Sequence, residues 1–414
     1  MLHLSAVAGS PLFDSGGVRL GRVGDLVVGL GAGDEPPRFR GLKARIGGRD
    51  LFVPASRIAS LKPSAVRTST TKLNLAQFRR RPGEALLRAD VLGRSLIDVD
   101  AARLVRAREI ELTFEEGSWR VAGIDPGLGA RLRRVVPRRW RAGTGRPGRF
   151  VPWSRLEPFV GHVPGSRLRL GARRLARLHP AQLADLVEAA SHDEGEEILH
   201  AVEREGDLEA EVFEELDDEH RVEFLRGRSD AEVASLLCEL SSNDAADLLM
   251  QLDQPRRLPV LNQMPAAQRE RVRGLLSYNP QTAGGIMNPE FVSVPGGATV
   301  AEAIRKVVGA RLPAKEAQAV YVSDGGRLTG ALPVVDLLRA PPEEAVSALL
   351  ESDPPAVPAT ADVPEIACVM SDYDLLSLPV VDDDGRMIGV ISLDDIVARI
   401  LPEGWRRRRR PARE

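Results

Sequence analysis

The feature that most limits how this chain can fold is a break in the helical pattern at residues 278–292. Gly284 and Gly285 stand together at its centre, and glycine disfavours a helix because it loses the most backbone freedom there. Pro280 and Pro289 flank the pair, and proline cannot continue a helix. We therefore expect a joint of fixed geometry between a helical array before the break and strand–helix units after it.

The segment before the break, residues 174–277, has turn signals near every twelfth residue. Side chains at such starts accept hydrogen bonds from the free N–H groups of the first helical turn. Helices this short are marginal alone, so they must stack, and we predict an all-α superhelix. The predicted helix starts are at Pro180, Ser191, Asp217, Ser229, Ser241 and Asp253.

The segment after the break contains one pattern twice. Residues 319–330 and 378–389 each read as a strand, a tight Asp/Gly turn and a returning strand. Two such units pack together, so we predict an α/β fold here. The helices expected beside these hairpins lie at 300–308, 335–339, 363–370 and 394–400.

The first 160 residues also contain an internal repeat. Residues 9–14 align with 93–98, and residues 52–58 align with 150–156. Short Val, Leu and Ile runs between glycine turns indicate small, strongly bent antiparallel sheets. Residues 61–83 link the two copies. Asp14 and Asp98 recur in the repeat, and we expect them to cap local turns.

Three segments resemble one family. Thr282–Val292, Met370–Arg386 and Ile388–Ile396 are similar to the junction and paired CBS domains of MgtE-type magnesium transporters. The opening of the chain, from Leu12 to Asp25, resembles a PRC-barrel domain. A transporter of the MgtE family continues into membrane helices, whereas this chain ends at Glu414. The resemblance therefore implies a sensor region without a pore of its own.

The predicted fold class is multidomain: small PRC-like β-barrels, an all-α helical superhelix, then an α/β CBS pair. The predicted domains are 1–62 and 83–160 (PRC-barrel-like), 174–277 (acidic helical superhelix), 284–345 and 346–402 (CBS 1 and CBS 2), and 403–414 (basic tail).

The resemblance also implies metal ligands. Mg²⁺ prefers carboxylate and carbonyl oxygens. Asp247 matches an acid that ligates magnesium in the family, and Asn243 stands where a second acid is expected. Asp244 is adjacent, but its direction differs by about 100°. Glu343 and Glu344 are further candidates, from the end of the first CBS unit. Helix capping and a solvated acidic face are the alternative explanation for these acids.

A nucleotide site is the other expectation. CBS pairs often bind adenine nucleotides, with a Ser or Thr on phosphate and an Asp three residues later on ribose. Ser392 and Asp395 have this spacing in the second unit, whereas the first unit has Pro333 in place of the hydroxyl. The alternative is that Asp395 only caps the final helix.

Composition excludes several classes of protein. No apolar run approaches the ~18 residues of a membrane helix, so we expect no membrane span. Only two cysteines are present, which fits a reducing cytoplasm. No Ser/His/Asp or Cys/His set can be assembled, so we expect no enzyme.

The charged residues are unevenly distributed. Residues 131–174 hold thirteen arginines and one acid, whereas residues 185–223 hold seventeen acids and two arginines. Opposed charge blocks indicate internal docking or separate partners.

These observations lead to one hypothesis and two alternatives. The chain is expected to be a cytoplasmic, magnesium-responsive regulatory protein, homodimeric through its CBS pair, with Mg²⁺ as its ion and an adenine nucleotide as a further ligand. One alternative is an auxiliary subunit of a separately encoded magnesium transporter, peripheral at the inner face of the membrane. The other is an adaptor that docks to RNA or the ribosome through the barrels and the Arg-rich segment.

Overall fold

The computed structural model describes residues 1–30, 35–71, 77–127, 150–159, 172–203, 207–310, 312, 316–350 and 354–401. The chain divides into two compact units, Met1–Phe224 and Leu225–Glu414. Most of the Arg-rich block at 131–174 and the whole predicted basic tail at 403–414 lie outside the described residues.

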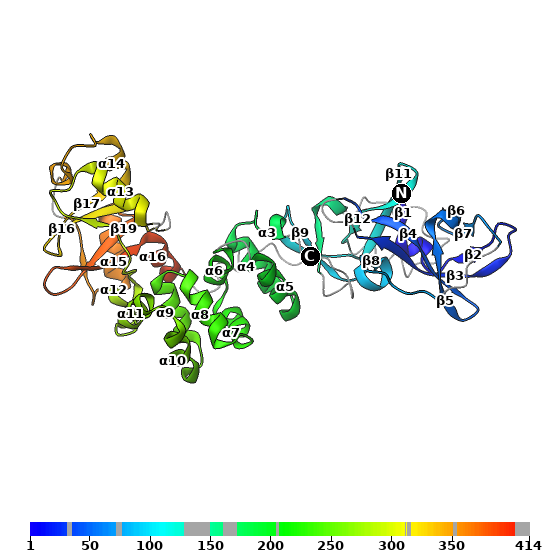
Figure 1. Cartoon of the computed structure of the whole chain (residues 1–414), viewed down its shortest axis with the longest axis horizontal. Coiled ribbons are helices and arrows are strands. Elements are labelled where there is room, and N and C mark those ends of the chain that lie inside the picture. Colours follow the sequence, from blue (N-terminus) through cyan, green and yellow to red (C-terminus); the bar gives the residue numbers. More distant parts are fainter. Residues whose placement is uncertain are drawn as a thin grey trace. The chain divides into compact units, whose positions relative to one another are not determined.

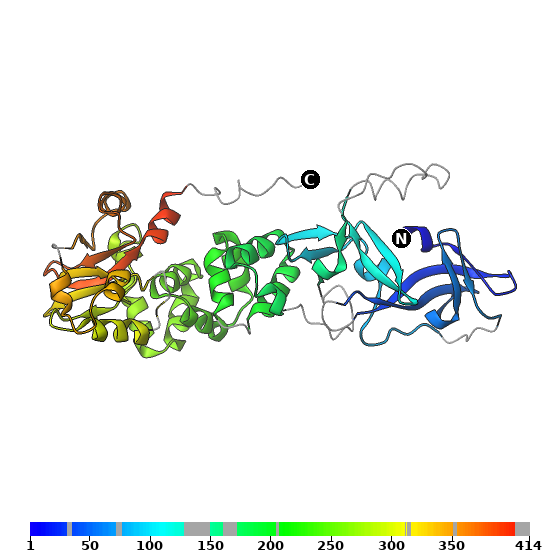
Figure 2. The same ribbon diagram turned by 90° about the horizontal axis from the view of Figure 1, so that it is seen from above.

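The first unit is built on an eleven-stranded sheet in the order β1-β11-β12-β4-β3-β2-β7-β6, with β13, β5 and β8 paired to β12, β4 and β3. The sheet curls into a nearly closed barrel, which fits the PRC-like prediction (Figure 2). Its strands are β1 Leu2–His3, β2 Pro11–Phe13, β3 Arg19–Gly29, β4 Arg38–Ile46, β5 Arg49–Pro54, β6 Ile58–Lys62, β7 Ala65–Thr68, β8 Glu84–Leu86, β11 Glu109–Glu115, β12 Ser118–Asp125 and β13 Val151–Pro152. A smaller sheet holds β9 Ser95–Asp98, β10 Arg103–Arg106 and β14 Leu156–Pro158.

The two sequence repeats share this sheet. Strand β1 pairs with β11, β4 pairs with β12 and β3 pairs with β8, so strands of the two copies pair directly with each other in one sheet. One apolar core also contains side chains from both copies. The predicted linker at 61–83 contains strand β7, which pairs with β2. The domain limits at 62 and 83 stay a prediction, and in the structure strand pairing crosses them.

Equivalent backbone hydrogen bonds recur in the two copies. The Gly9 N–H donates to the Val23 carbonyl at 2.8 Å, and the Gly93 N–H donates to the Ala107 carbonyl at 2.6 Å. Both glycines have φ = +84°, a conformation that other residues rarely adopt. The duplication seen in the sequence is therefore present in the backbone.

A pair of buried acids ties the copies together. Asp25, in the first copy, accepts hydrogen bonds from the Arg88 and Ala89 N–H groups of the short π-helix Leu87–Val91, at 2.8 and 3.0 Å. Glu109, in the second copy, accepts from the Ser5 N–H of α1 (Leu4–Val7) at 3.1 Å. Each copy thus caps the short helix of the other. Burial raises the pKa of the Asp25 carboxyl.

The remainder of the first unit is helical. Arg174, on α3, forms an ion pair with Glu157 on β14 at 2.9 Å and so joins the helices to the small sheet. Ser191 caps α5 as predicted, in a capping box with Glu194. The helices are α3 Ala172–Leu175, α4 Pro180–Ala189, α5 His192–Val202 and α6 Leu208–Glu215; α7, Asp218–Arg226, spans the division between the units.

The second unit begins with four stacked helices (Figure 1). Ser229, Ser241 and Asp253 are the N-caps of the first three, as the sequence predicts. The helices are α8 Asp230–Glu239, α9 Ser242–Gln251, α10 Gln254–Gln263 and α11 Ala266–Leu275. The joint after them contains a single turn, α12 Ala283–Ile286. A side chain on Gly285 would stand 2.3 Å from the Asn279 carbonyl oxygen, so glycine is required at this position.

Two three-stranded sheets follow, in the orders β15-β16-β17 and β18-β19-β20. Both predicted hairpins are present, and the predicted helices are confirmed to within two residues. The Tyr321 hydroxyl donates to Ser377 Oγ at 2.9 Å and links the sheets. The elements are β15 Ser293–Val294, α13 Val300–Ala310, β16 Ala319–Asp324, β17 Arg327–Pro333, α14 Val334–Arg339, β18 Val357–Pro358, α15 Val363–Asp372, β19 Ser377–Val381, β20 Met387–Ser392 and α16 Leu393–Ile400.

Within the described ranges, no helix combines the length and the apolar character that crossing a bilayer requires.

Candidate metal centre

The first part of the site is the N-terminus of α9. Ser241 caps this helix, and its hydroxyl lies 2.8 Å from Asn243 Oδ1 and within hydrogen-bond distance of Asp244 Oδ2. Asn243 is buried, with 7% of its surface exposed, and Asp244 is half-buried. The cap therefore fixes two oxygen-bearing side chains at one end of the helix.

The second part is the joint after α12. The Asn288 N–H donates to the Val390 carbonyl at 2.7 Å, and the Val390 N–H donates back at 2.9 Å, so this segment lies beside β20. Asn288 Oδ1 accepts the Glu290 N–H at 3.0 Å. Asn288 is 5% exposed, and its Nδ2 finds no hydrogen-bond acceptor among the described residues. A buried donor without a partner is costly, so a bound acceptor such as a water molecule fits here.

The third part is the turn from β20 into α16. Ser392 caps α16, and its hydroxyl donates to Asp395 Oδ2, while the Ser392 N–H lies 3.3 Å from the same oxygen. This capping box is the alternative that the sequence left open for Asp395. It does not exclude a ligand, because both residues also line a pocket.

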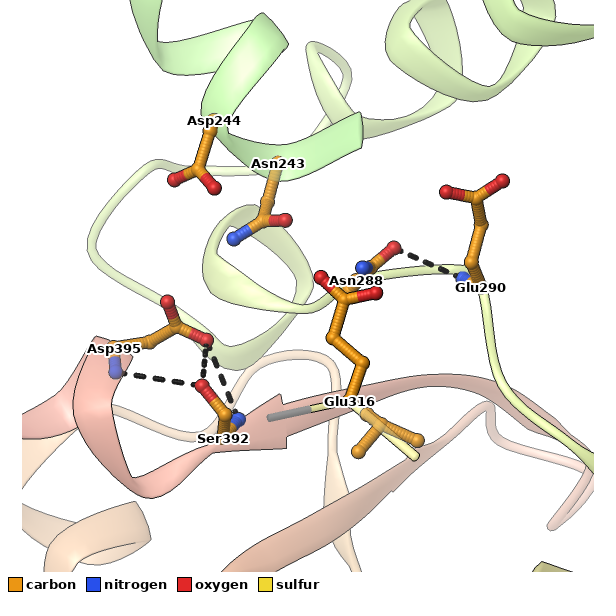
Figure 3. Close-up of a pocket in the computed structure, with 8 residues that line it drawn as sticks. Asn243, Asp244, Asn288, Glu290, Glu316, Ser392 and Asp395 are labelled. Carbon is orange, nitrogen blue, oxygen red and sulfur yellow. Dashed lines mark hydrogen bonds between the residues drawn. The ribbon is translucent and has the colours of Figure 1, made fainter. Parts of the chain in front are cut away.

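These three parts meet in one pocket, which Glu316 also lines (Figure 3). Figure 3 shows Asn243 and Asp244 on one side, facing Ser392 and Asp395 on the other. The cavity has a volume of about 10 Å³, which is the room of one water-sized species and far too little for a nucleotide. Four carboxylates line it, from Asp244, Glu290, Glu316 and Asp395. Like charges gathered at one place repel one another, so a small cation is the species that such a lining suits.

The structure brings together only some of the predicted ligands. Asn243, Asp244, Ser392 and Asp395 share the pocket, although the sequence assigned the first two to a metal and the others to a nucleotide. Asp247 lies one turn further along α9, where its Oδ2 is 2.9 Å from Arg399 Nη2 on α16.

The remaining two candidates lie elsewhere. Glu343 is exposed, and the Glu344 carbonyl accepts the Val300 N–H at 2.9 Å, at the start of α13. Neither residue lines the pocket.

The predicted direction of Asp244 needs correction. The helical period placed its side chain away from that of Asn243, but both line the pocket. The reason is local: Asn243 and Asp244 occupy the first turn, where side chains turn back toward the cap, and the Ser241 hydroxyl holds both. A helical wheel does not represent this effect.

Three polar lining residues were not predicted: Asn288, Glu290 and Glu316. The first two lie in the junction that carries the family resemblance, directly after the glycine break, and this position is the only signal that could have indicated them. Arg271 on α11 pairs with Glu290 at 2.9 Å, so one acid of the pocket already has a cationic neighbour.

The first unit has a separate group of potential ligands, Glu188, Asp217 and His220, whose ligand atoms lie within 4.8 Å of one another. Each has a structural contact. Glu188 accepts the Asp217 N–H at 2.9 Å, and Asp217 accepts the His220 N–H at 3.0 Å at the start of α7. These contacts account for the cluster as helix capping.

Two family models match the chain. Residues 178–281 match the MgtE intracellular N domain, and residues 283–343 and 346–402 each match the CBS domain. The magnesium transporter MgtE of Thermus thermophilus is 32% identical over 195 residues, which are 45% of this chain and 43% of that protein. The MgtE of Bacillus subtilis is 27% identical over 194 residues, 47% and 43% of the two chains. The chain thus spans less than half the length of these relatives.

Two solved structures share the fold. The cytosolic domain of the Mg²⁺ channel MgtE in complex with ATP superposes with a TM-score of 0.52 at 31% identity, covering 55% of this chain and 93% of that one. The soluble part of a magnesium transporter also has a TM-score of 0.52, at 25% identity, covering 55% and 90%.

Proposed function

We propose, from the MgtE N domain and CBS pair that residues 178–402 form, that this chain is a magnesium-responsive regulatory protein of the cytoplasm. The observation that carries the proposal is the pocket in which acids of α9, the joint and the CBS pair meet. The relatives are magnesium transporters, and the function proposed here is regulation rather than catalysis.

The residues present fit Mg²⁺. Carboxylate oxygens are the hard ligands that this ion takes, and it usually keeps several waters and binds only one or two carboxylates directly. Asp244 and Asp395 come from the two sides of the pocket, so these two carboxylates would hold the ion, and Glu290 and Glu316 would add negative charge. Bound Mg²⁺ would supply the positive charge that offsets their repulsion.

The chain's own residues then account for the response. Without the ion, the lining acids repel each other, and the arrangement of α9 against β20 and α16 depends on neighbouring ion pairs such as Asp247–Arg399. When the ion is bound, the compact arrangement is stabilised relative to a more open one. The stabilisation equals the difference between the free energies with which the two arrangements bind the ion. The joint at 283–292 lies between the two sides of the pocket, so its backbone should report the change.

The test is hydrogen exchange of the joint in the full chain, measured against Mg²⁺ and against NaCl of matched ionic strength. Mg²⁺ should slow exchange at 283–292 and NaCl should not. Asp244→Asn should remove the effect while leaving an oxygen for the helix cap.

The control is Asp362→Asn. Asp362 is an N-cap of the same CBS unit, accepts the Glu365 N–H at 2.9 Å and does not line the pocket. Protection that is equal in NaCl, or lost equally in the control variant, would refute the proposal.

A homodimer through the CBS pair is part of the proposal. Apolar side chains are exposed three positions apart on two of its helices: Val335 and Leu338 on α14, and Val397 and Ile400 on α16. Such stripes mark a buried helical contact. Ile400→Asp should convert a dimer to a monomer in sedimentation velocity, whereas a wild-type monomer would refute this part.

We revise the position at which a nucleotide is expected to bind. The relative whose cytosolic domain was solved with ATP motivates it, but the pocket at Ser392 and Asp395 is too small for a nucleotide. We propose ATP binding elsewhere in the CBS pair, independent of the Asp395 carboxylate. Calorimetry with ATP on wild type and Asp395→Asn should give equal affinities.

The auxiliary-subunit alternative shares the same site. It differs in requiring a membrane protein that copurifies with the chain.

A further inference from the structure

The barrel surface formed by residues 1–100 carries charge that the proposed function does not use. Five acids within residues 1–100 are buried: Asp14, Asp25, Glu84, Asp90 and Asp98. Their carboxylates serve the fold, as helix caps or in ion pairs such as Asp98–Arg155. The basic side chains, in contrast, are mostly exposed: Arg19, Arg22, Arg38, Arg40, Arg45, Arg49, Arg57, Lys62, Arg67, Arg79, Arg81, Arg88 and Arg94. The exposed acids of the same described residues are Glu35 and Asp100.

Three of the arginines line a groove of about 490 Å³ between the end of β3, the start of β4 and the turn before β8. Arg38 and Arg40 lie on the exposed face of β4, and Arg81 is on the turn. A side chain on Gly29 would stand 2.7 Å from Arg40 Nε, so the absence of one lets Arg40 lie across this strand.

The acids of the groove leave part of this charge available. Glu35 pairs with Arg38 at 3.4 Å, and both side chains are more than half exposed, so the pair is weak. Glu84 is buried and accepts the Arg81 N–H at 3.1 Å. The Arg81 guanidinium lies over the Phe52 ring, 5.3 Å from its centroid. Arg40 makes no ion pair with any residue that the structure describes.

The surroundings of the groove decide what kind of partner fits. The core of a protein–protein interface is rich in aromatic and apolar side chains and poor in charge. Among the described residues of 1–100, the only large hydrophobic side chains that are exposed are Met1 and Val18. A nucleic-acid backbone needs no apolar partner, since its affinity comes from phosphate neutralisation and counterion release. Arginine is also suited to phosphate, which its planar fork can bind through two hydrogen bonds.

We propose that the groove lined by Arg38, Arg40 and Arg81 binds the phosphate backbone of single-stranded RNA. This site lies in the first unit, so it is independent of the magnesium pocket. It also differs from the Arg-rich block at 131–174, most of which lies outside the described residues.

The test is fluorescence anisotropy of the full chain with a labelled RNA of about 20 nucleotides, long enough to cover a typical single-strand site. Replacing all three arginines with glutamine should weaken binding by about tenfold or more and lower the slope of log K against log salt by about 2, at ~0.7 per phosphate contact. The single variant Arg40→Gln keeps the test valid if the triple variant misfolds, because Arg40 is exposed and should lose only part of the affinity.

The matched control replaces Arg19, Arg49 and Arg57, which are exposed on the same barrel but do not line the groove. This control should retain affinity to within about threefold, since charge at a distance is screened. Equal loss in both triple variants would overturn the proposal, as would loss only on replacing Arg133, Arg134, Arg138 and Arg139 with serine. Absent RNA binding, or binding to anionic vesicles alone, would also overturn it.

Discussion

Replacing Asp25 with alanine is the most direct test of how the two repeats depend on each other. The substitution removes the acceptor for the Arg88 and Ala89 N–H groups, at 2.8 and 3.0 Å, far along the chain from Asp25 itself. A donor left unsatisfied costs about 1–3 kcal/mol. Arg88 and Ala89 are themselves exposed, so water replaces part of the loss. Removing the buried carboxylate also removes the unfavourable free energy of burying its charge. We therefore expect the free energy of unfolding to fall by about 2 kcal/mol in total.

The assay combines two measurements. Urea unfolding followed by tryptophan fluorescence reports on the stability of this region, because two of the chain's four tryptophans, Trp119 and Trp153, belong to the barrel. Hydrogen exchange locates the damage: Asp25→Ala should speed exchange in the segment 84–92, within the other repeat. Glu109→Ala should speed exchange around Ser5 instead, since Glu109 accepts that N–H at 3.1 Å.

Faster exchange in the opposite repeat is the result expected if the reciprocal caps join the two repeats. If Asp25→Ala speeds exchange only in its own strand, or equally across the barrel, the reciprocal caps do not join the repeats.

The pKa of Asp25 adds a pH dependence to the same prediction. Burial raises this pKa above the ordinary 3.8, so the folded chain keeps the proton at pH values where the unfolded chain has released it. The stability gained is complete below 3.8 and is lost as pH rises through the folded-state pKa. The amide of Asp25→Asn does not titrate, so the stability of wild type relative to the variant should fall as pH rises from 3.8 through the raised folded-state pKa of Asp25. A constant difference across that range would contradict the assignment.

Three further predictions concern the second unit. Asn243→Asp should strengthen Mg²⁺ binding by about tenfold, because ligand charge sets affinity; an unchanged midpoint of Mg²⁺ protection would contradict this. Gly389→Ala should destabilise the joint by about 1–3 kcal/mol, since the added Cβ would stand 2.6 Å from Met287 Sδ; unaltered exchange at 283–292 would argue against this packing. Arg399→Gln should lower the free energy of unfolding by about 0.5 kcal/mol at low salt and leave it unchanged at high salt, because the ion pair with Asp247 is partly exposed. A double-mutant cycle of Arg399 and Asp247 measures this coupling.

Local signals explain what the sequence could predict. A cap such as Ser241 and a hairpin such as 378–389 depend on neighbouring residues, so their positions follow from the chain alone. The order of helical array, joint and paired strand–helix units follows from the same signals, and the resemblance to the MgtE family identifies these units as CBS domains. Asp14 is also a local case, since its Oδ1 accepts the Val18 N–H at 2.8 Å, as predicted for a turn.

Pairing between strands that are far apart in the chain explains what the sequence could not predict. The hydrophobic pattern of β4 shows which face is buried, but it does not show that β12 of the other repeat lies beside it. Asp98 illustrates the consequence: it was expected to cap a turn, but it is 1% exposed and bonded to Arg155 at 2.9 Å. Glu316 was missed for the same reason, because only the packing of the CBS pair brings it to the pocket.

The pocket shows why its residues are hard to assign from sequence and how they can be tested. Asp244 and Asp395 are each hydrogen-bonded to the serine that caps their helix, so a structural role explains them fully without a metal. The two roles use different properties of the side chain: a cap needs an oxygen acceptor, whereas a cation site needs negative charge. An amide in place of the carboxylate keeps the first and removes the second. Asn243, already an amide and already bonded to Ser241, is the natural example of this state. The Asp-to-Asn variants therefore separate the two roles, whereas alanine variants would lose both.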